Sequence, residues 1–263
     1  MIEHTFRLPT EAPDGRRIVV IGDVHGQAEL FAKSLDAVDD PKGAVLILTG
    51  DLIDRGPASA DCLRLAREAE ARFGELIILP GNHEQMAWLG SKAPKSDWAG
   101  CFLMNGGDAT LREFGGDWDA LVSAFPAQVV DRLEGRLPVW HREGGLLFIH
   151  AGVNPDIAPS VFFNTPSDPG CPPQLMDEGE SPLWVRYPFY ANTKHVGPYA
   201  ALGGDPVLVV YGHTRIGTRD PNVLAQRVEE EIGNWRVAMD ASGSGMITVA
   251  EFTKDVMKLK ILS

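Results

Sequence analysis

Five short apolar segments, each followed at once by Asp, Asn or His, constrain the fold of this 263-residue chain more than any other feature. Segments this short, rich in β-branched residues and bounded by glycine, are typical of buried strands. The motifs that follow them are Gly22-Asp23-Val24-His25-Gly26, Gly50-Asp51-Leu52-Ile53-Asp54-Arg55-Gly56, Gly81-Asn82-His83-Glu84, His150-Ala151-Gly152 and Gly212-His213. Ligand sites of open α/β sheets gather at the carboxyl ends of the strands. We therefore expect the five motifs to form one site.

The second motif carries the highest concentration of charge. Asp51, Asp54 and Arg55 lie between glycines that allow a sharp turn, directly after a buried strand. Such charge is costly to bury unless a metal ion or an anion neutralises it. Taken alone, the motif would also fit an ordinary turn with a surface ion pair. The presence of the other four motifs favours a functional site instead.

Residues 16–84 alternate between strand and helix patterns. Residues 27–38 place apolar side chains on one face, as an amphipathic helix does. A second helix is expected after Pro57, a residue that suits a first helical turn. The order strand-helix-strand-helix-strand predicts a βαβαβ unit with parallel strands.

The rest of the chain changes character. Residues 85–143 interleave aromatic residues with Gly and Asp, which indicates a mostly helical cap over the site with a small core of its own. The Pro- and Gly-rich residues 154–179 predict a long surface loop. We expect a single domain, residues 1–263, with the cap inserted in it and a second group of strands at 206–211, 236–240, 245–252 and 257–262.

The composition is that of a soluble globular protein, with 44% hydrophobic and 23% charged residues. A net charge of −12 without any run of Lys or Arg argues against a general nucleic-acid-binding protein, but it does not exclude a phosphorylated substrate. Cys62, Cys101 and Cys171 fit neither a disulfide framework nor a zinc motif, so we expect the reducing cytoplasm. Residues 1–17 contain no apolar signal-peptide core, and no segment has the apolar length needed to cross a membrane.

The motif side chains match the needs of a dinuclear metal centre. Two divalent cations about 3.5–4 Å apart can clamp a phosphoryl group and share a bridging hydroxide that attacks phosphorus in line. Such a site needs a bridging carboxylate, further oxygen donors and several imidazoles, and the chain supplies Asp23, His25, Asp51, Asn82, His150 and His213. These ligands suit manganese, iron or zinc better than calcium. A single histidine of this kind would be taken as a core residue, but the pattern shared by five strand ends favours a site.

The order and spacing of the motifs resemble the phosphoprotein phosphatase branch of the calcineurin-like metallophosphoesterases. The resemblance extends over about residues 16–252, nearly the whole chain. Two further segments resemble the bacterial and phage serine/threonine phosphatase subgroup, Asn105-Gly106-Gly107-Asp108-Ala109-Thr110-Leu111 and Pro182-Leu183-Trp184-Val185-Arg186. The resemblance implies an α/β fold: a two-sheet β-sandwich core built from βαβαβ units flanked by helices, with an inserted helical cap. It also implies two divalent ions, with manganese expected and iron or zinc as alternatives.

Roles for individual residues follow from the same resemblance. Asp23, His25 and Asp51 would hold the first metal, with Asp51 bridging, and Asn82, His150 and His213 would complete the second. His83 would protonate the leaving alkoxide, and Asp54 would accept a hydrogen bond from it and favour its protonated form. Arg55 and Arg186 would grip phosphate oxygens, for which a planar guanidinium is well suited.

Residues 240–251 fit the spacing of an EF-hand calcium loop but not its chemistry. Ser242 and Ser244 stand where acidic ligands are usual, and the segments on either side predict strands instead of helices. The resemblance implies a turn between two strands here, and we do not expect calcium binding.

Two residues near the expected rim of the site depart from the family pattern. Arg215 follows the Gly-His-Thr motif where the family usually has Pro, and Ala241 follows Asp240 where it usually has Thr. These departures bear on substrate preference and not on the metal centre. We expect Arg215 to be a solvated loop residue, with a further phosphate contact as the alternative, and Glu84 to make a structural hydrogen bond instead of binding metal.

The sequence therefore predicts a metal-dependent phosphomonoester hydrolase, a serine/threonine protein phosphatase acting on a phosphoprotein or phosphopeptide. Water would attack directly, because no motif Cys or Ser is placed as a nucleophile. One alternative is a hydrolase of dinucleoside polyphosphates such as diadenosine tetraphosphate, a related branch with the same metal motifs; residues 183–186 favour the phosphatase. A non-catalytic binding protein is the other alternative, and the complete set of expected ligands argues against it.

Overall fold

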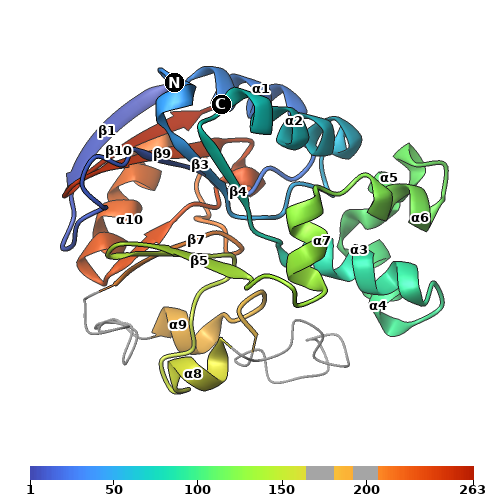
Figure 1. Cartoon of the computed structure of the whole chain (residues 1–263). Coiled ribbons are helices and arrows are strands. Elements are labelled where there is room, and N and C mark those ends of the chain that lie inside the picture. Colours follow the sequence, from blue (N-terminus) through green and yellow to red (C-terminus); the bar gives the residue numbers. More distant parts are fainter. Residues whose placement is uncertain (164–180, 192–206) are drawn as a thin grey trace.

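Two β-sheets pack face to face with helices on their outer surfaces in the computed structural model, which describes residues 1–163, 181–191 and 207–263 (Figure 1). The larger sheet has the strand order β1-β10-β9-β2-β3-β4, formed by Ile2–Arg7, Val256–Leu262, Ile247–Thr253, Ile18–Ile21, Val45–Leu48 and Glu75–Ile78. The smaller sheet has the order β5-β6-β7-β8, formed by Trp140–Glu143, Leu146–Ile149, Leu208–Tyr211 and Arg236–Ala238. This two-sheet α/β architecture confirms the predicted fold class.

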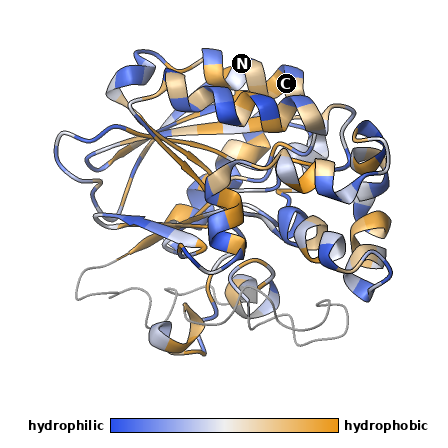
Figure 2. Ribbon diagram, turned by 45° about the vertical axis from the view of Figure 1, so that its right-hand side comes forward, coloured by the Kyte–Doolittle hydropathy of each residue, from blue (hydrophilic) through white to orange (hydrophobic). Residues whose placement is uncertain are grey.

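The first half of the larger sheet is the predicted βαβαβ unit. Strands β2, β3 and β4 are parallel, and helices α1 (Ala28–Asp36) and α2 (Ser59–Arg72) connect them. Alternate strand residues face opposite sides of the sheet. Val20 and Ile47 lie in the core shared with the smaller sheet, whereas Val19 and its partner Leu46 on β3 pack under the helices. Figure 2 shows the result, apolar strands enclosed by helices whose outer faces are polar.

The predicted cap is mostly helical. Its helices are α3 (Asn82–Lys92), α4 (Asp97–Phe102), α5 (Asp108–Glu113), α6 (Trp118–Ser123) and α7 (Ala127–Leu133), with a π-helical turn at Leu103–Gly107. The helical part ends earlier than residue 143, because Trp140–Glu143 pairs with β6 in the smaller sheet. The aromatic side chains of Trp88, Trp98 and Phe102 do not form a separate core; they join the apolar cluster that also lies beneath α1 and α2.

The second group of strands is divided between the two sheets. β7 and β8 belong to the smaller sheet and β9 and β10 to the larger one, so the chain crosses over at the 3₁₀ turn Ser242–Ser244. Strand β8 precedes the EF-hand-like segment and β9 begins within it, so strands and not helices lie on either side of the turn, as the sequence indicated. The sequence did not predict β1, β5 or helix α10 (Pro221–Gly233), which packs against β8.

Most of the loop predicted at 154–179 lies outside the described residues, as does Cys171. Within the described part of that region, Pro159–Phe162 forms the short helix α8, and α9 (Tyr187–Ala191) follows the 183–186 segment. No helix among the described residues combines the length and apolar character that crossing a bilayer requires.

Candidate active site

The five strand ends meet at one edge of the two sheets. β2, β3 and β4 deliver motif residues from the larger sheet, and β6 and β7 deliver His150 and His213 from the smaller one. The structure brings all six predicted metal ligands together, buried and linked by one series of short contacts: Asp23, His25, Asp51, Asn82, His150 and His213.

Asp51 stands at the centre of this group. Its Oδ2 lies 3.4 Å from His25 Nε2, and its Oδ1 lies 3.5 Å from His150 Nε2. Gly81 makes room for the carboxylate, since a Cβ there would lie 2.0 Å from Asp51 Oδ1. Burial alone would raise the pKa of Asp51, but the surrounding histidines and Arg55 outweigh it and lower that pKa. Asp51 is therefore ionised at neutral pH.

The histidine rings are oriented by carbonyl groups outside the cluster. His150 Nδ1 lies 2.8 Å from the carbonyl oxygen of Thr49, and His25 Nδ1 lies 2.9 Å from that of Ile53. Nδ1 must donate in both contacts, which leaves each Nε2 as an acceptor facing the site. Burial is the main cause that lowers the pKa of His25, His150 and His213, so the rings are neutral.

The resulting donor set fits divalent cations. His150 Nε2 lies 3.0 Å from Asn82 Oδ1, so two lone pairs meet at a distance that is unfavourable without a proton or cation between them. His213 Nε2 is buried with no hydrogen-bond partner among the described residues. Asp51, His150 and His213 offer ligand atoms within 4.8 Å of one another, and Asp51, His25 and His83 do so as well. Imidazole nitrogens mixed with carboxylate and amide oxygens suit first-row transition metals.

Asp23 lies at the side of the cluster. Its Oδ2 accepts a hydrogen bond of 3.0 Å from the backbone N–H of His213 and lies 4.0 Å from His25 Nε2. Gly212 permits this approach, because a Cβ at that position would lie 2.0 Å from Asp23 Oδ1. Burial, followed by the nearby Asp240 and Asp51, raises the pKa of Asp23 well above its usual value. A divalent cation would remove this unfavourable arrangement of acids.

His83 and Asp54 form a hydrogen-bonded pair beside the cluster. His83 Nδ1 lies 2.6 Å from Asp54 Oδ2, and Thr110 Oγ1 donates to Asp54 Oδ1 at 2.6 Å. Ser59 Oγ in turn lies 2.8 Å from Thr110 Oγ1. Burial would lower the pKa of His83, but Asp51 and the bond to Asp54 outweigh it and raise that pKa. The sequence placed His83 next to Asp54, but it assigned no role to Thr110, which lies in the 105–111 motif.

Arg55 and Arg186 both lie at the opening of the site. Arg55 is exposed, and its guanidinium contacts Nε2 of His25 and, at 2.9 Å, Nε2 of His83. Arg186 is also exposed, and the preceding Trp184 ring lies edge-on to the His213 ring with centroids 6.2 Å apart. After burial and His150, the charge of Arg186 contributes to the lowered pKa of His213.

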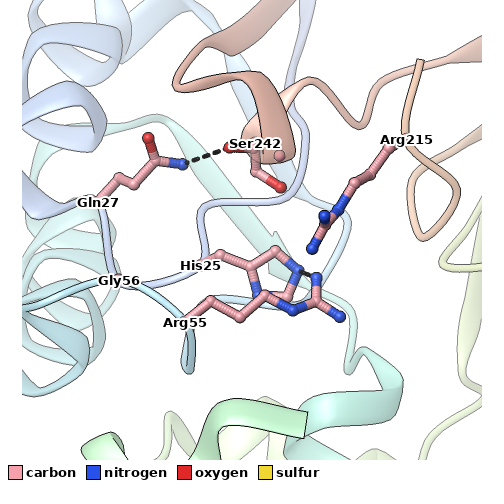
Figure 3. Close-up of a pocket in the computed structure, with 7 residues that line it drawn as sticks. His25, Gln27, Arg55, Gly56, Arg215 and Ser242 are labelled. Atoms are coloured by element: carbon pink, nitrogen blue, oxygen red, sulfur yellow. Dashed lines mark hydrogen bonds between the residues drawn. The ribbon is translucent and has the colours of Figure 1, made fainter. Parts of the chain in front are cut away.

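A pocket of about 330 Å³ opens beside His25 (Figure 3). Arg55 reaches it from the loop after β3, Arg215 from the loop after β7, and Gln27 and Ser242 form its wall. Arg215 is exposed, as expected, and it also lines this pocket. Ala241 is buried in the core and does not lie at the rim.

Glu84 has the structural role that the sequence indicated. Its Oε2 accepts hydrogen bonds from the backbone N–H groups of Asp51 (2.9 Å) and Gly81 (2.8 Å), and its Oε1 accepts one from Leu52 (2.8 Å). One buried carboxylate thus joins the loop after β3 to the start of α3.

Residues 16–217 match the family model of the calcineurin-like phosphoesterases. The chain belongs to this family. The matched range includes all six residues of the cluster.

Relatives within the calcineurin-like phosphoesterases carry more than one name. Serine/threonine-protein phosphatase 1 of Salmonella typhimurium is 43% identical over 99 residues, covering 37% of this chain and 42% of the relative. A symmetrical bis(5'-nucleosyl)-tetraphosphatase of Aromatoleum aromaticum is 30% identical over 147 residues, covering 52% of this chain and 45% of the relative. The matched part of the chain therefore spans less than half the length of these relatives.

Solved structures agree on the fold. A protein serine/threonine phosphatase from Saccharomyces cerevisiae superimposes with a TM-score of 0.50 at 14% identity, covering 95% of this chain and 80% of that one. A cold-active protein-tyrosine phosphatase from Shewanella gives a TM-score of 0.50 at 17% identity, covering 94% and 80%. At this identity the likeness concerns the fold alone.

Proposed function

We propose that the protein is a metal-dependent phosphomonoesterase that removes phosphate from phosphoserine or phosphothreonine in proteins. The observation that carries the proposal is the convergence of Asp51 with four other ligand-bearing strand ends, beside the buried pair of His83 and Asp54. The relative from Salmonella typhimurium, named a serine/threonine-protein phosphatase, supports the protein substrate.

Two divalent cations, held by Asp23, His25, Asp51, Asn82, His150 and His213, would polarise the phosphate and activate the attacking water. We propose manganese for these positions, because mixed nitrogen and oxygen ligands without thiolate suit it, and iron or zinc are the alternatives. In the described part of the chain Cys62 and Cys101 are buried, and Ser59 Oγ is bonded to Thr110. None of these groups is placed to attack phosphorus, which supports direct attack by water.

His83 would supply the proton that the leaving serine or threonine oxygen needs. Its Nδ1 is bonded to Asp54, so only Nε2 is directed toward the site. Asp54 cannot easily rotate away, because both of its carboxylate oxygens are bonded. Before the transfer, Asp54 stabilises the positive charge of protonated His83. As the P–O bond breaks, the proton on Nε2 passes to the leaving oxygen.

Arg55 and Arg186 would bind the phosphate oxygens. The Arg55 guanidinium contacts Nε2 of both His25 and His83, and the proposed reaction gives each of those nitrogens another partner. We therefore expect its long side chain to turn toward bound phosphate. Arg186 is exposed and its charge acts on the nearby His213, so it would add a second guanidinium for the phosphate oxygens.

Hydrolysis of dinucleoside polyphosphates is the second candidate, favoured by the relative from Aromatoleum aromaticum. Metal-depleted protein reloaded with manganese, iron or zinc separates the two: phosphate release from a phosphoserine peptide is compared with cleavage of diadenosine tetraphosphate, and p-nitrophenyl phosphate serves as a general ester. We expect the phosphopeptide to give the higher kcat/KM. A preference for the dinucleotide would support the second candidate, and inactivity on all three with every metal would refute both.

A further inference from the structure

The pocket beside His25 is positively charged in an otherwise acidic protein. The chain carries a net charge of −12, yet the pocket is lined by Arg55 and Arg215 and by no Asp or Glu among the described residues. His25, a proposed metal ligand, forms its inner side. An anion bound there would therefore lie next to the phosphate held at the metal centre.

Arg215 lines the pocket without a hydrogen bond or ion pair of its own among the described residues. Its guanidinium extends into the pocket toward His25 (Figure 3). The charge of Arg215 acts against the raised pKa that burial gives Asp240, but Asp240 directs Oδ1 to the N–H and hydroxyl of Ser242 at 3.0 and 2.7 Å and forms no ion pair with Arg215. An unpaired guanidinium in such a pocket is available to a ligand.

The pocket wall is shaped to hold the arginine side chain. Arg215 lies directly on Gly243, where a Cβ would come within 2.3 Å of Arg215 Cδ. Gln27 Nε2 donates to the carbonyl oxygens of Ser242 (3.3 Å) and Val24 (3.2 Å), which ties the turn that carries Gly243 to the start of α1. The place of Arg215 thus depends on a neighbouring residue without a side chain.

We infer that Arg215 binds a second anionic group of the substrate, beside the phosphate that is hydrolysed. The inference rests on the proposed function for the site of the hydrolysed phosphate. A planar guanidinium pairs equally well with a carboxylate and with a phosphate. The second anion is therefore an acidic side chain adjacent to the phosphoserine, or a neighbouring phosphate of a polyphosphate.

The test compares matched substrates. For manganese-loaded protein, kcat/KM is measured on two phosphoserine peptides that differ only in Asp or Asn beside the phosphoserine, and on diadenosine tetraphosphate relative to p-nitrophenyl phosphate. We expect Arg215→Gln to reduce one of these two ratios by roughly tenfold, the effect of losing a charge-assisted hydrogen bond. Arg219→Gln is the matched control: it removes the same charge from an exposed residue outside the pocket and should keep both ratios.

Gly243→Ala tests the geometry without changing charge. The added methyl group would displace Arg215, so the same ratio should fall as in Arg215→Gln. A fall in the peptide ratio identifies the carboxylate as the second anion, and a fall in the dinucleotide ratio identifies the phosphate. Ratios that Arg215→Gln leaves unchanged would overturn the inference, even if the enzyme is active.

Calorimetric binding of the two peptides, phosphate and pyrophosphate gives a readout that needs no turnover. If the protein hydrolyses nothing, the proposed function fails, while a selective loss of affinity for the Asp peptide or for pyrophosphate in Arg215→Gln would still support the second anion site. Equal affinities in wild type and variant would overturn it.

Discussion

Replacing Glu84 by Gln should destabilise the protein far more than a carboxylate-to-amide change usually does. The Glu84 side chain is fully buried and accepts hydrogen bonds from three backbone N–H groups, those of Asp51, Gly81 and Leu52. A glutamine has one acceptor oxygen. In its best orientation this oxygen keeps the bonds to Asp51 and Gly81, and the amide nitrogen then faces the N–H of Leu52.

The magnitude follows from that orientation. Removing one partner of a buried hydrogen bond costs the desolvation penalty of the N–H that is left, about 1–3 kcal/mol and more where a charged group is involved. We expect the free energy of unfolding to fall by about 3–5 kcal/mol, at the upper end for single substitutions. The opposite orientation would lose two bonds and cost more.

Glu113→Gln provides the matched control. Glu113 also accepts hydrogen bonds from two backbone N–H groups, of Ser59 at 3.0 Å and Ala60 at 2.9 Å, but its side chain is exposed. Water can replace the lost bond there. We therefore expect the free energy of unfolding to fall by only about 1 kcal/mol, as for the loss of a helix N-cap. The comparison therefore separates the effect of burial from that of the chemical change.

Urea denaturation of both variants in the presence of a chelator measures the free energy of unfolding without bound metal. Tryptophan fluorescence and circular dichroism must give coincident transitions for the free energies to be compared. If Glu84→Gln and Glu113→Gln differ by less than about 1 kcal/mol, the buried bonds of Glu84 do not have the strength assigned to them.

Three further predictions concern the chemistry of the site. His83→Asn should lower kcat by about 10²–10⁴-fold while metal content stays unchanged by elemental analysis, and full activity would exclude His83 as the proton donor. Asp51→Asn should bind fewer metal ions than wild type, because the charge nearest His25 and His150 is lost; unchanged stoichiometry would exclude a bridging role. Arg186→Ala should raise KM for a phosphate ester by roughly tenfold with a smaller effect on kcat, and a selective loss of kcat would contradict a role in phosphate binding.

The location of the candidate site was predictable because strand direction fixes it. Parallel strands β2, β3 and β4 end at the same edge of the sheet, so residues that follow them in sequence must lie near one another. His150 and His213 come from the other sheet, and their place beside Asn82 depends on how the two sheets pack. Their shared pattern suggested that place, but only the structure shows the contacts.

Other elements left weaker signals. In β1 only alternate residues are partly buried, one of them His4, so the strand depends on pairing with β10 more than on its own periodicity. Helix α10 did carry a signal: Asp220 caps its first turn through the N–H of Asn222, and Leu224 and Val228 are spaced for one buried face. The division of the last four strands between two sheets has no local signal, because it is decided by tertiary packing.

Several residues of the site adopt a left-handed backbone conformation, which residues other than glycine disfavour. The site residues with a left-handed backbone are His25 (φ 46°), Asp51 (φ 52°), Asp54 (φ 73°), Arg55 (φ 65°) and His213 (φ 64°). Each such residue costs about 1–3 kcal/mol and persists only where surrounding structure holds it.

Hydrogen bonds to the same backbone N–H groups provide that support. The N–H of Asp51 is bonded to Glu84, that of Asp54 to Ser59 and Thr110, and that of His213 to Asp23. The acceptors are all buried side chains, so these bonds are protected from competing water. Glu84 and Ser59 therefore act on the chemistry through the backbone, and Thr110 does so in addition to its bond with the Asp54 carboxylate: they fix the strained turns from which the carboxylates and imidazoles extend.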